Sequence, residues 1–277
     1  MKIAISGISG FLGANLALFF SKENKVTGIS TSAIAANFRV YDFTQLELME
    51  HPDVVIHCHA AVVSGNTVLD NETLFNGNVH ATDKIVNQFP KAAHLYISSA
   101  SVHGSSAGTI HEKTPVAPLS AYAIAKLWGE NIVLKAEKSV VIRLSSLYGN
   151  GMKENTLIPN YTNQAIKNHQ IEVWGKGERR QNYFHISDAA TLLEAIIRKN
   201  DWSQQIYLGT SDKEYSNIEI AKMIAAETQS EIIFKNNDNA LSVHYNNSFT
   251  QNSLNWQPQT AITTGLKQYT AWKRRQS

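Results

Sequence analysis

A tyrosine and a lysine stand four residues apart in the middle of the chain, in the stretch Ser120-Ala-Tyr122-Ala-Ile-Ala-Lys126. Four residues make about one turn of an α-helix, so both side chains would lie on the same face. One interpretation is an ordinary pair on a surface helix. The other is chemical: a lysine cation favours the phenolate and lowers the pKa of the phenol, which makes Tyr122 a proton donor and acceptor.

Ser99 is a second residue with chemical potential. It follows the run His94-Leu-Tyr-Ile-Ser98, which is typical of a buried strand that leads into a loop. In parallel sheets, ligands bind at the loops that follow the carboxyl ends of the strands. The Ser99 hydroxyl is therefore a candidate to hydrogen-bond a substrate oxygen.

Three glycines, Gly7, Gly10 and Gly13, separate a short strand-like run from an apolar helix near the start of the chain. Glycine permits a tight turn and lets the backbone approach a pyrophosphate, while the N–H groups of the following helix attract the anion. The spacing is G-x-x-G-x-x-G and differs from the G-x-G-x-x-G of ordinary dinucleotide dehydrogenases. Its position favours a phosphate-binding turn over a glycine-rich turn without a ligand.

The end of the second expected strand bears on the choice of cofactor. An acidic residue there would bind the ribose 2′-hydroxyl of NAD and repel the phosphate of NADP. The chain has Ser30-Thr31-Ser32 instead, and these hydroxyls repel neither cofactor. Arg39 is a candidate for a 2′-phosphate or an ordinary surface arginine, and Asp42 either accepts from the adenine amino group or begins a turn. The sequence thus leaves NAD or NADP open.

The elements that would position these residues alternate between strand and helix. We expect apolar strands at 2–6, 25–30, 38–42, 53–57, 94–98 and 139–143. Helices are expected between several of these strands, and one of them covers 78–87. This pattern predicts an α/β protein with a Rossmann-type doubly wound parallel sheet. We expect an NAD(P)-binding domain over 1–150, to which the chain returns near 183–210. Residues 151–277 would mainly form a smaller C-terminal α/β substrate lobe.

Composition excludes several classes of function. The 277 residues are 43% hydrophobic, enough for a large core, and a net charge of +2 gives no reason to expect nucleic acid or a membrane surface. The single cysteine, Cys58, excludes an internal disulfide, and we expect a cytoplasmic protein. We expect no metal at His57, Cys58 and His59, because neighbouring strand residues point to opposite faces and no fourth ligand is suitably spaced.

A series of motifs runs along nearly the whole chain. They are Gly7-x-x-Gly10-x-x-Gly13; His57-Cys-His-Ala60-Ala61; Asn78 with Val79, Ala81 and Thr82; Ser98-Ser99-Ala-Ser-Val102-His-Gly104; Glu112-x-x-Pro115-x-x-Pro118-x-Ser-x-Tyr122-x-x-x-Lys126; Arg143-Leu-Ser-Ser-Leu-Tyr148-Gly149; Tyr183-Phe-His185-Ile-Ser-Asp188; and Leu254-Asn-Trp256-Gln-Pro258. In order and spacing, this series resembles the extended short-chain dehydrogenase/reductase superfamily, in its NAD(P)-dependent nucleotide-sugar epimerase/dehydratase branch.

The resemblance implies a role for each matching residue. Tyr122 would be the general acid/base, Lys126 would also hold the nicotinamide ribose, and Ser99 would bind the same substrate oxygen as Tyr122. The residues expected at the cofactor are Gly7, Gly10, Phe11, Leu12, Gly13, Ser30, Asp42, Ala60, Asn78, Tyr122 and Lys126, with Asn78 in a structural or cofactor-side role. Those expected at the substrate are Ser146, Arg179 and Arg180, and either arginine would grip a diphosphate or lie on a solvated surface.

One departure from the family bears on the reaction. Many nucleotide-sugar dehydratases carry Asp-Glu directly after the serine, where this chain has Ala100 and Ser101, so loss of water by that route is not expected. Our leading hypothesis is an NAD(P)-dependent epimerase of a nucleotide-activated sugar. The alternatives are an NADPH-dependent 4-ketosugar reductase, similar to dehydrorhamnose reductases, and a non-catalytic NAD(P)-sensing module. The resemblance also implies a homodimer.

Overall fold

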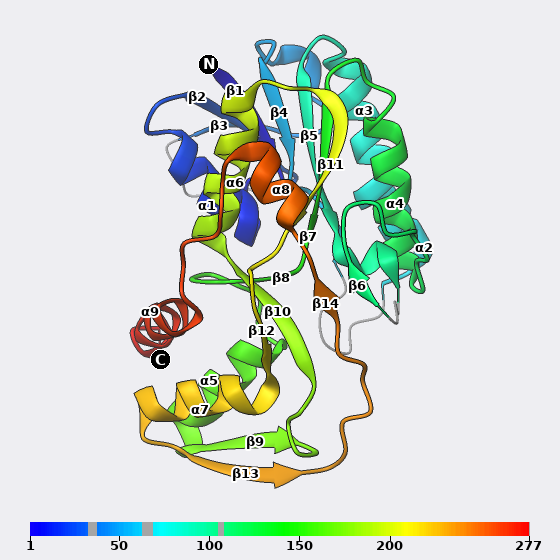
Figure 1. Ribbon diagram of the computed structural model, residues 1–277. Coiled ribbons are helices and arrows are strands. Elements are labelled where there is room, and N and C mark those ends of the chain that lie inside the picture. The colour runs from blue at the N-terminus through cyan, green and yellow to red at the C-terminus, as the bar shows by residue number, and fades with distance from the viewer. Residues whose placement is uncertain (33–37, 63–68, 105–107, 277) are drawn as a thin grey trace. The chain divides into compact units, whose positions relative to one another are not determined.

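Seven strands form the main sheet of the computed structural model, in the order β11-β7-β5-β4-β1-β2-β3 (Figure 1). The strands are β1 Lys2–Ser6, β2 Lys25–Ile29, β3 Arg39–Tyr41, β4 Val54–His57, β5 Ala93–Ser99, β7 Ser139–Leu144 and β11 Ser203–Gly209. Every pair of neighbouring strands in this sheet whose register is described is parallel. The strand order reverses direction between β1 and β4, which confirms the predicted doubly wound Rossmann-type sheet.

The structure describes residues 1–32, 38–62, 69–104 and 108–276. The chain divides into two compact units. The first unit comprises Met1–Gly104, Glu112–Leu144 and Leu193–Leu208, and the second comprises Ser105–His111, Ser145–Leu192 and Gly209–Ser277.

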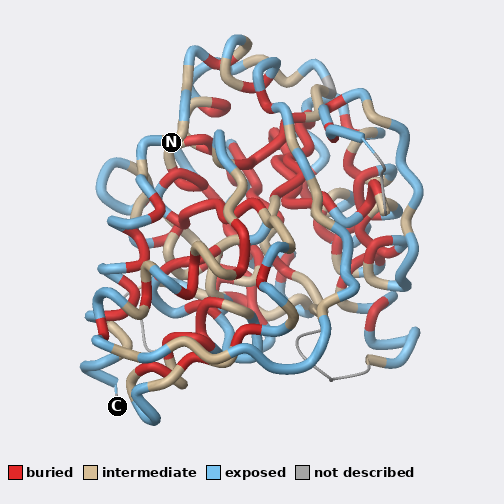
Figure 2. Tube along the Cα trace, turned by 60° about the horizontal axis from the view of Figure 1, so that its bottom comes forward, coloured by how far each residue is buried: buried red, intermediate tan, exposed pale blue. Residues whose placement is uncertain are grey.

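The central strands of the first unit are apolar because both faces of the sheet are covered. All residues of β4 and β7 are buried, as are six of the seven residues of β5. Helix α1 (Phe11–Phe20) lies on one side of the sheet, and α3 (Ala81–Gln88) and α4 (Ala121–Val133) lie on the other (Figure 1). Figure 2 shows the resulting alternation of buried and exposed stretches along the chain. Continuous burial explains why these strands lack the alternating pattern of half-exposed sheets.

The helix expected over 78–87 differs from the observed one. It begins earlier, as α2 (Asn71–Phe75), because the Asp70 carboxylate accepts the Thr73 N–H at 2.7 Å and caps the first turn. A wide π-helical turn, η2 (Asn76–His80), then leads into α3. Short 3₁₀ turns are found at η1 (Leu46–Leu48) and η3 (Ala100–His103).

The second unit contains short strands and helices. Strands β8 (Ser146–Tyr148), β10 (Arg180–His185) and β12 (Glu214–Ser216) form one sheet; β9 (Gln170–Trp174) pairs with β13 (Glu231–Lys235), and β6 (Thr109–Ile110) pairs with β14 (His244–Tyr245). Its helices are α5 (Leu157–Asn168), the first half of α6 (Ile186–Lys199), α7 (Asn217–Thr228), α8 (Ser248–Leu254) and α9 (Ile262–Arg274).

Two late sequence motifs have a structural role in this unit. The buried Asp188 carboxylate accepts the backbone N–H groups of Gln259 and Thr260, and the Trp256 indole N–H donates to the Thr191 hydroxyl at 3.0 Å. These bonds attach the segment before α9 to the start of α6. The side chains of Asp188 and Trp256 therefore fix this packing.

Candidate functional site

The glycine turn has no room for side chains, because neighbouring backbone atoms lie where a Cβ would be. Gly7 has a left-handed φ of +67°, and a Cβ added there would lie 2.7 Å from the backbone of His59. A Cβ at Gly13 would lie 2.2 Å from the Gly7 carbonyl oxygen. Gly10 is the N-cap of α1 and supplies no side chain to the first N–H groups of the helix, where Phe11 and Leu12 stand. The α1 N-terminus thus presents backbone N–H groups that can bind an anion.

The end of β2 holds hydroxyls that bond to one another. The buried Ser30 hydroxyl lies 2.8 Å from the Ser9 hydroxyl and accepts the Ser32 N–H at 3.0 Å. These bonds link the glycine turn to β2. Register pairs Arg39 with Thr27, and the Arg39 guanidinium lies over the Tyr41 ring, with its Cζ 5.0 Å from the ring centroid.

Asp42 begins a turn. One oxygen of its carboxylate accepts both the N–H and the hydroxyl of Thr44, at 2.9 Å each, and these bonds lower the pKa of Asp42. This geometry favours the turn-forming interpretation of Asp42, and leaves its second carboxylate oxygen for an outside donor.

Asn78 joins the π-helical turn to the loop after β4. Its buried amide donates to the carbonyl of Ala61 at 3.1 Å and to that of Leu74 at 3.0 Å. Next to it, a Cβ on Gly77 would lie 2.9 Å from the Ala61 Cβ. The amide nitrogen of Asn78 therefore fixes the Ala60–Ala61 loop, where Ala60 is partly exposed, and its cofactor-side role stays a prediction.

Ser99 and Tyr122 meet at the carboxyl end of β5. Ser120 caps α4 by accepting the Ala123 N–H at 3.2 Å, and this cap sets the start of the helix that carries Tyr122. The Tyr122 and Ser99 side chains are hydrogen-bonded, and Ser99 also accepts from the Ser101 hydroxyl at 2.9 Å. The structure differs from the expected depression of the phenol pKa. Burial raises the pKa of Tyr122 to about 12, and the Ser99 bond opposes only part of that rise.

Lys126 lies one turn further along α4, on the same face. It is only 2% exposed, and its Nζ lies 4.3 Å from the centroid of the buried Tyr96 ring. The part of the chain that the structure describes gives this ammonium no hydrogen bond and no ion pair. Burial lowers the pKa of Lys126 to about 8, while electrostatic interactions with Cys58 and Glu130 oppose the shift. At neutral pH, the side chain is mainly cationic and available to a ligand.

The histidines near this lysine are structural. The His57 Nε2 lies 2.9 Å from the His94 Nδ1, and His59 is held between the hydroxyls of Ser6 at 2.6 Å and Thr82 at 3.0 Å. Burial lowers the pKa of His59 to about 3 and that of His94 to about 4, so both are neutral at pH 7. Among the described residues, the structure has no group of three or more His, Cys, Asp or Glu side chains that could hold a metal ion.

Three residues near the site received no role from the sequence: Tyr96, Glu130 and Arg143. Glu130 and Arg143 form a buried ion pair of 2.7 Å between α4 and β7. The spacing of Tyr122, Lys126 and Glu130, four residues each, places all three on one helical face and is the signal that could have indicated Glu130. Nothing in the linear sequence identifies Arg143 as its partner.

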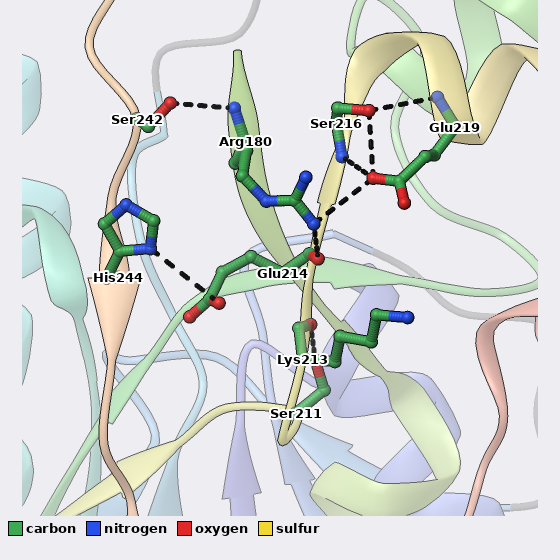
Figure 3. Close-up of polar contacts among 8 residues, drawn as sticks. All are labelled: Arg180, Ser211, Lys213, Glu214, Ser216, Glu219, Ser242 and His244. Carbon is green, nitrogen blue, oxygen red and sulfur yellow. Dashed lines mark hydrogen bonds and ion pairs between the residues drawn. The ribbon is translucent and has the colours of Figure 1, made fainter. Parts of the chain in front are cut away.

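The substrate candidates belong to the second unit. The Arg180 guanidinium donates to the Glu214 carbonyl at 2.7 Å and lies 3.2 Å from the Glu219 carboxylate, so it is committed to the start of α7 (Figure 3). The Nε of Arg179, in contrast, is buried without a hydrogen-bond partner among the residues that the structure describes. Ser146 is exposed at the start of β8. The structure thus distinguishes the two adjacent arginines, which the sequence did not.

A dinucleotide fits the residues of the first unit on two observations. At Gly7 and Gly13, neighbouring backbone lies so close that any side chain would clash, so only glycine allows this turn. Lys126 is a buried cation without a bonding partner among the described residues. Gly7, Gly10 and Gly13 would hold a pyrophosphate, and Lys126 would hold ribose hydroxyls. None of the described helices is both long and apolar enough to cross a membrane.

Comparisons with known proteins agree with this geometry. The chain is 25% identical over 268 residues to a dTDP-D-glucose 4,6-dehydratase of Dictyostelium discoideum, covering 80% of this chain and 61% of that protein. It therefore spans less than two thirds of that relative's length. It is 23% identical to an uncharacterized UDP-glucose epimerase of Bacillus subtilis, over 72% of this chain and 73% of that protein.

A solved structure shares the fold. A UDP-glucuronic acid 4-epimerase from Bacillus cereus in complex with NAD superposes with a TM-score of 0.89, at 20% identity, over 99% of this chain and 97% of that one. Residues 3–209 match the family model described as the NAD dependent epimerase/dehydratase family, which agrees with the expected nicotinamide cofactor. The chain belongs to the NAD dependent epimerase/dehydratase family.

Proposed function

We propose that this enzyme is an NAD(P)-dependent epimerase of a nucleotide-activated sugar, and that Tyr122 is its general acid/base. The observation that carries the proposal is the cluster of Ser99, Tyr122 and Lys126, in which the phenol bonds to a hydroxyl and the ammonium has no partner among the described residues. Family membership and the names of the relatives, which refer to UDP- and dTDP-sugars, support the substrate class.

The roles of the three residues follow from their chemistry. Ser99 orients the substrate oxygen toward the Tyr122 phenol, and Tyr122 accepts the proton of a ring hydroxyl and later returns it. Lys126 places a positive charge beside the phenolate that forms and so lowers the energy of this form. A bound oxidised nicotinamide supplies a hydride acceptor and a further positive charge. That charge matters, because the protein alone leaves the pKa of Tyr122 at about 12.

Elimination of water is disfavoured by the residues that follow Ser99. Ala100 is buried and has no polar group, and the Ser101 hydroxyl donates to Ser99. Neither side chain can exchange a proton at neutral pH. We therefore assign this chain to epimerisation rather than dehydration, although the first relative is a dehydratase by name.

A 4-ketosugar reductase is the second candidate. The observation that favours it is the end of β2, where Ser30 replaces the acid that would repel the 2′-phosphate of NADP. A reductase consumes its reduced cofactor in every cycle, whereas an epimerase regenerates it. The requirement for added cofactor therefore distinguishes the two functions.

Within the second unit, we assign the diphosphate of the substrate to Arg179. Within the described part of the chain its buried Nε has no hydrogen-bond partner, while the Arg180 guanidinium is held by Glu214 and Glu219. An arginine can grip a diphosphate through two parallel hydrogen bonds, which an arginine already engaged in an ion pair cannot do.

We also propose a homodimer that forms in the cytoplasm. Phe75 on α2 and Trp128 on α4 are 42% and 53% exposed, and their rings lie 5.5 Å apart. With the exposed Ile124, they form an apolar surface on the helices that family resemblance assigns to dimer contact. Analytical ultracentrifugation of wild type and Trp128→Glu tests this: we expect a dimer and a monomer respectively, and a monomeric wild type would contradict it.

The experiment that tests the proposed function has two parts. Mass spectrometry of the purified protein identifies any small molecule that copurifies, and NMR then follows UDP-glucose, UDP-glucuronic acid and dTDP-glucose with the protein. We expect bound NAD and interconversion of one sugar without added reductant. Turnover that needs NADPH would establish the reductase instead, and no turnover of any sugar with cofactor bound would favour a sensing module.

A further inference from the structure

A buried carboxylate and a buried arginine lie next to the catalytic lysine. Glu130 is 1% exposed and Arg143 is 4% exposed. The Arg143 Nε donates to one carboxylate oxygen at 3.0 Å and its Nη2 to the other at 2.7 Å. The Ser98 hydroxyl donates to the first oxygen at 2.5 Å. Both oxygens of Glu130 are thus bound, and the pair joins α4, β5 and β7.

Lys126 precedes this carboxylate by four residues on the same helix. Residues four apart on a helix are neighbours, and a lysine and a glutamate at this spacing attract each other. In the structure, Lys126 instead lies over the Tyr96 ring, and Glu130 bonds to Arg143 and Ser98. The absence of a Cβ at Gly129 permits this arrangement, because a Cβ there would lie 2.0 Å from the Tyr96 hydroxyl.

Other groups around Lys126 offer it no negative charge at neutral pH. The buried or partly buried ionisable residues on the packed elements are His57, Cys58 and His59 at the end of β4, His94 and Tyr96 on β5, His103 on η3, Tyr122 and Glu130 on α4, and Arg143 on β7. Glu72 of α2, His80 of η2, and Asp83 and Lys84 of α3 are exposed. The buried thiol and phenols keep their protons, since burial raises the pKa of Cys58 to about 12 and that of Tyr122 to about 12. Glu130 is therefore the one buried anion in this described group.

We propose that Arg143 is a positioning residue that occupies Glu130 and so leaves the Lys126 ammonium free for the cofactor ribose and the Tyr122 phenol. Without Arg143, Glu130 would attract Lys126 along α4, and the cation would be neutralised within the protein. His103 lies on the other side of the guanidinium, with its Nε2 3.4 Å from the Arg143 Nη1, and so connects the pair to the loop after β5. The role at the cofactor rests on the proposed function, whereas the competition between Arg143 and Lys126 for Glu130 does not.

The test measures the ionisation of Lys126 directly in the protein without added ligand. Lysine labelled at Cε is titrated by NMR, and Lys126→Met identifies the signal. We expect a midpoint near pH 8 in wild type. Arg143→Met should raise that midpoint by about one pH unit, because Glu130 is left unpaired near the ammonium. Glu130→Gln should lower it, because Arg143 is then an unpaired cation.

The double variant separates positioning from simple structural support. Glu130→Gln with Arg143→Met removes both charges, so the midpoint should return close to that of wild type. Damage to packing alone would not produce shifts of opposite sign that cancel. If Arg143→Met does not fold, the midpoint of Glu130→Gln is compared with that of the double variant, and the double variant should titrate at higher pH. Arg198→Met, which breaks the exposed pair with Glu194, is the matched control and should shift nothing.

The result that would overturn the proposal is a Lys126 midpoint that does not rise when Arg143 is replaced in either background. Turnover is measured separately on the same variants, with a loss of at least about tenfold expected for Arg143→Met and partial recovery in the double variant. If the midpoints shift as expected but Tyr122→Phe leaves turnover intact, the proposed function fails and the positioning role of Arg143 stands.

Discussion

Lys126 in the first unit and Arg180 in the second are both cations next to an expected ligand site, yet their surroundings differ. The Lys126 ammonium is buried over the Tyr96 ring and has no anion of its own among the described residues. The Arg180 guanidinium lies between the Glu219 carboxylate and the Glu214 carbonyl (Figure 3). From this difference we propose a criterion: a cation without a partner among the described residues binds a ligand, whereas a paired cation supports the fold. By the same criterion, Arg179 is closer to Lys126 than to Arg180, because its buried Nε also has no partner among the described residues.

The largest effect is expected when a tyrosine hydroxyl is removed from the first unit, and the same change in the second unit is the control. Tyr122→Phe should lower kcat by roughly a thousandfold, the scale of general acid–base catalysis, because it removes the proton donor. Tyr183→Phe, which removes a buried hydroxyl that accepts from Gln181, should leave kcat within a few-fold of wild type. Both are measured by NMR on the sugar that the enzyme interconverts. Equal losses in the two variants would remove the distinction between the units.

Local spacing in the sequence was enough to select the candidate residues of the first unit, whose roles stay predictions. The glycine turn and the Tyr122–Lys126 pair depend on residues that are close in sequence. Continuous apolar runs separated by helical segments indicated the parallel sheet. The Glu130–Arg143 pair joins a helix to a strand, and no local pattern specifies that contact. The direction of the Tyr122 pKa shift was missed for a related reason, because burial is a property of the packed protein.

The second unit was harder to predict, because its polar residues are used in tertiary contacts. Arg179 and Arg180 are adjacent and of the same type, and only the position of Glu219 on α7 distinguishes them. Asp188 likewise looked like part of a functional motif, but it binds the backbone at Gln259 and Thr260. Sequence motifs there indicated the family without separating packing from binding.

Gly13→Ala should damage the glycine turn of the first unit and leave the second unit intact. The added Cβ would lie 2.2 Å from the Gly7 carbonyl oxygen, so the turn must shift. We expect dinucleotide affinity to fall about a hundredfold and unfolding free energy to fall by about 1–3 kcal/mol. Titration calorimetry with NAD and urea unfolding measure the two effects. Gly108→Ala, whose Cβ meets nothing within 4 Å, is the control, and equal behaviour of the two would contradict the role of the glycine turn.

Arg179→Met and Arg180→Met test the criterion within the second unit. Arg179→Met should raise KM for the nucleotide sugar by about tenfold or more, because a charged hydrogen-bonding partner of the diphosphate is lost. Arg180→Met should leave KM nearly unchanged and lower stability by up to about 1 kcal/mol, since its partly exposed ion pair supports α7. The reverse assignment of KM and stability effects would show that pairing does not separate the two arginines.

The smallest effect concerns pH and the buried histidines of the first unit. Burial lowers the pKa of His59 to about 3 and that of His94 to about 4, so the folded chain binds fewer protons than the unfolded chain below about pH 6.5. Stability should therefore fall as pH decreases from about 6.5 to about 5, by up to about 1.4 kcal/mol per pH unit for each histidine.

Urea unfolding at several pH values checks this slope. His94→Gln should reduce it, because one lowered pKa is removed, and His80→Gln on the exposed face of η2 should not. A slope that is the same in all three proteins would mean that the buried histidines do not control acid stability.

A crystal structure of the enzyme with NAD and its nucleotide sugar would show whether Tyr122 and Lys126 contact the substrate and the cofactor. We predict that the Lys126 Nζ leaves or shares its place over Tyr96 to bond a ribose hydroxyl, at about 2.7–3.2 Å, while the Tyr122 phenol reaches a sugar oxygen at a similar distance. A dinucleotide bound with its nicotinamide end remote from both side chains would contradict the account.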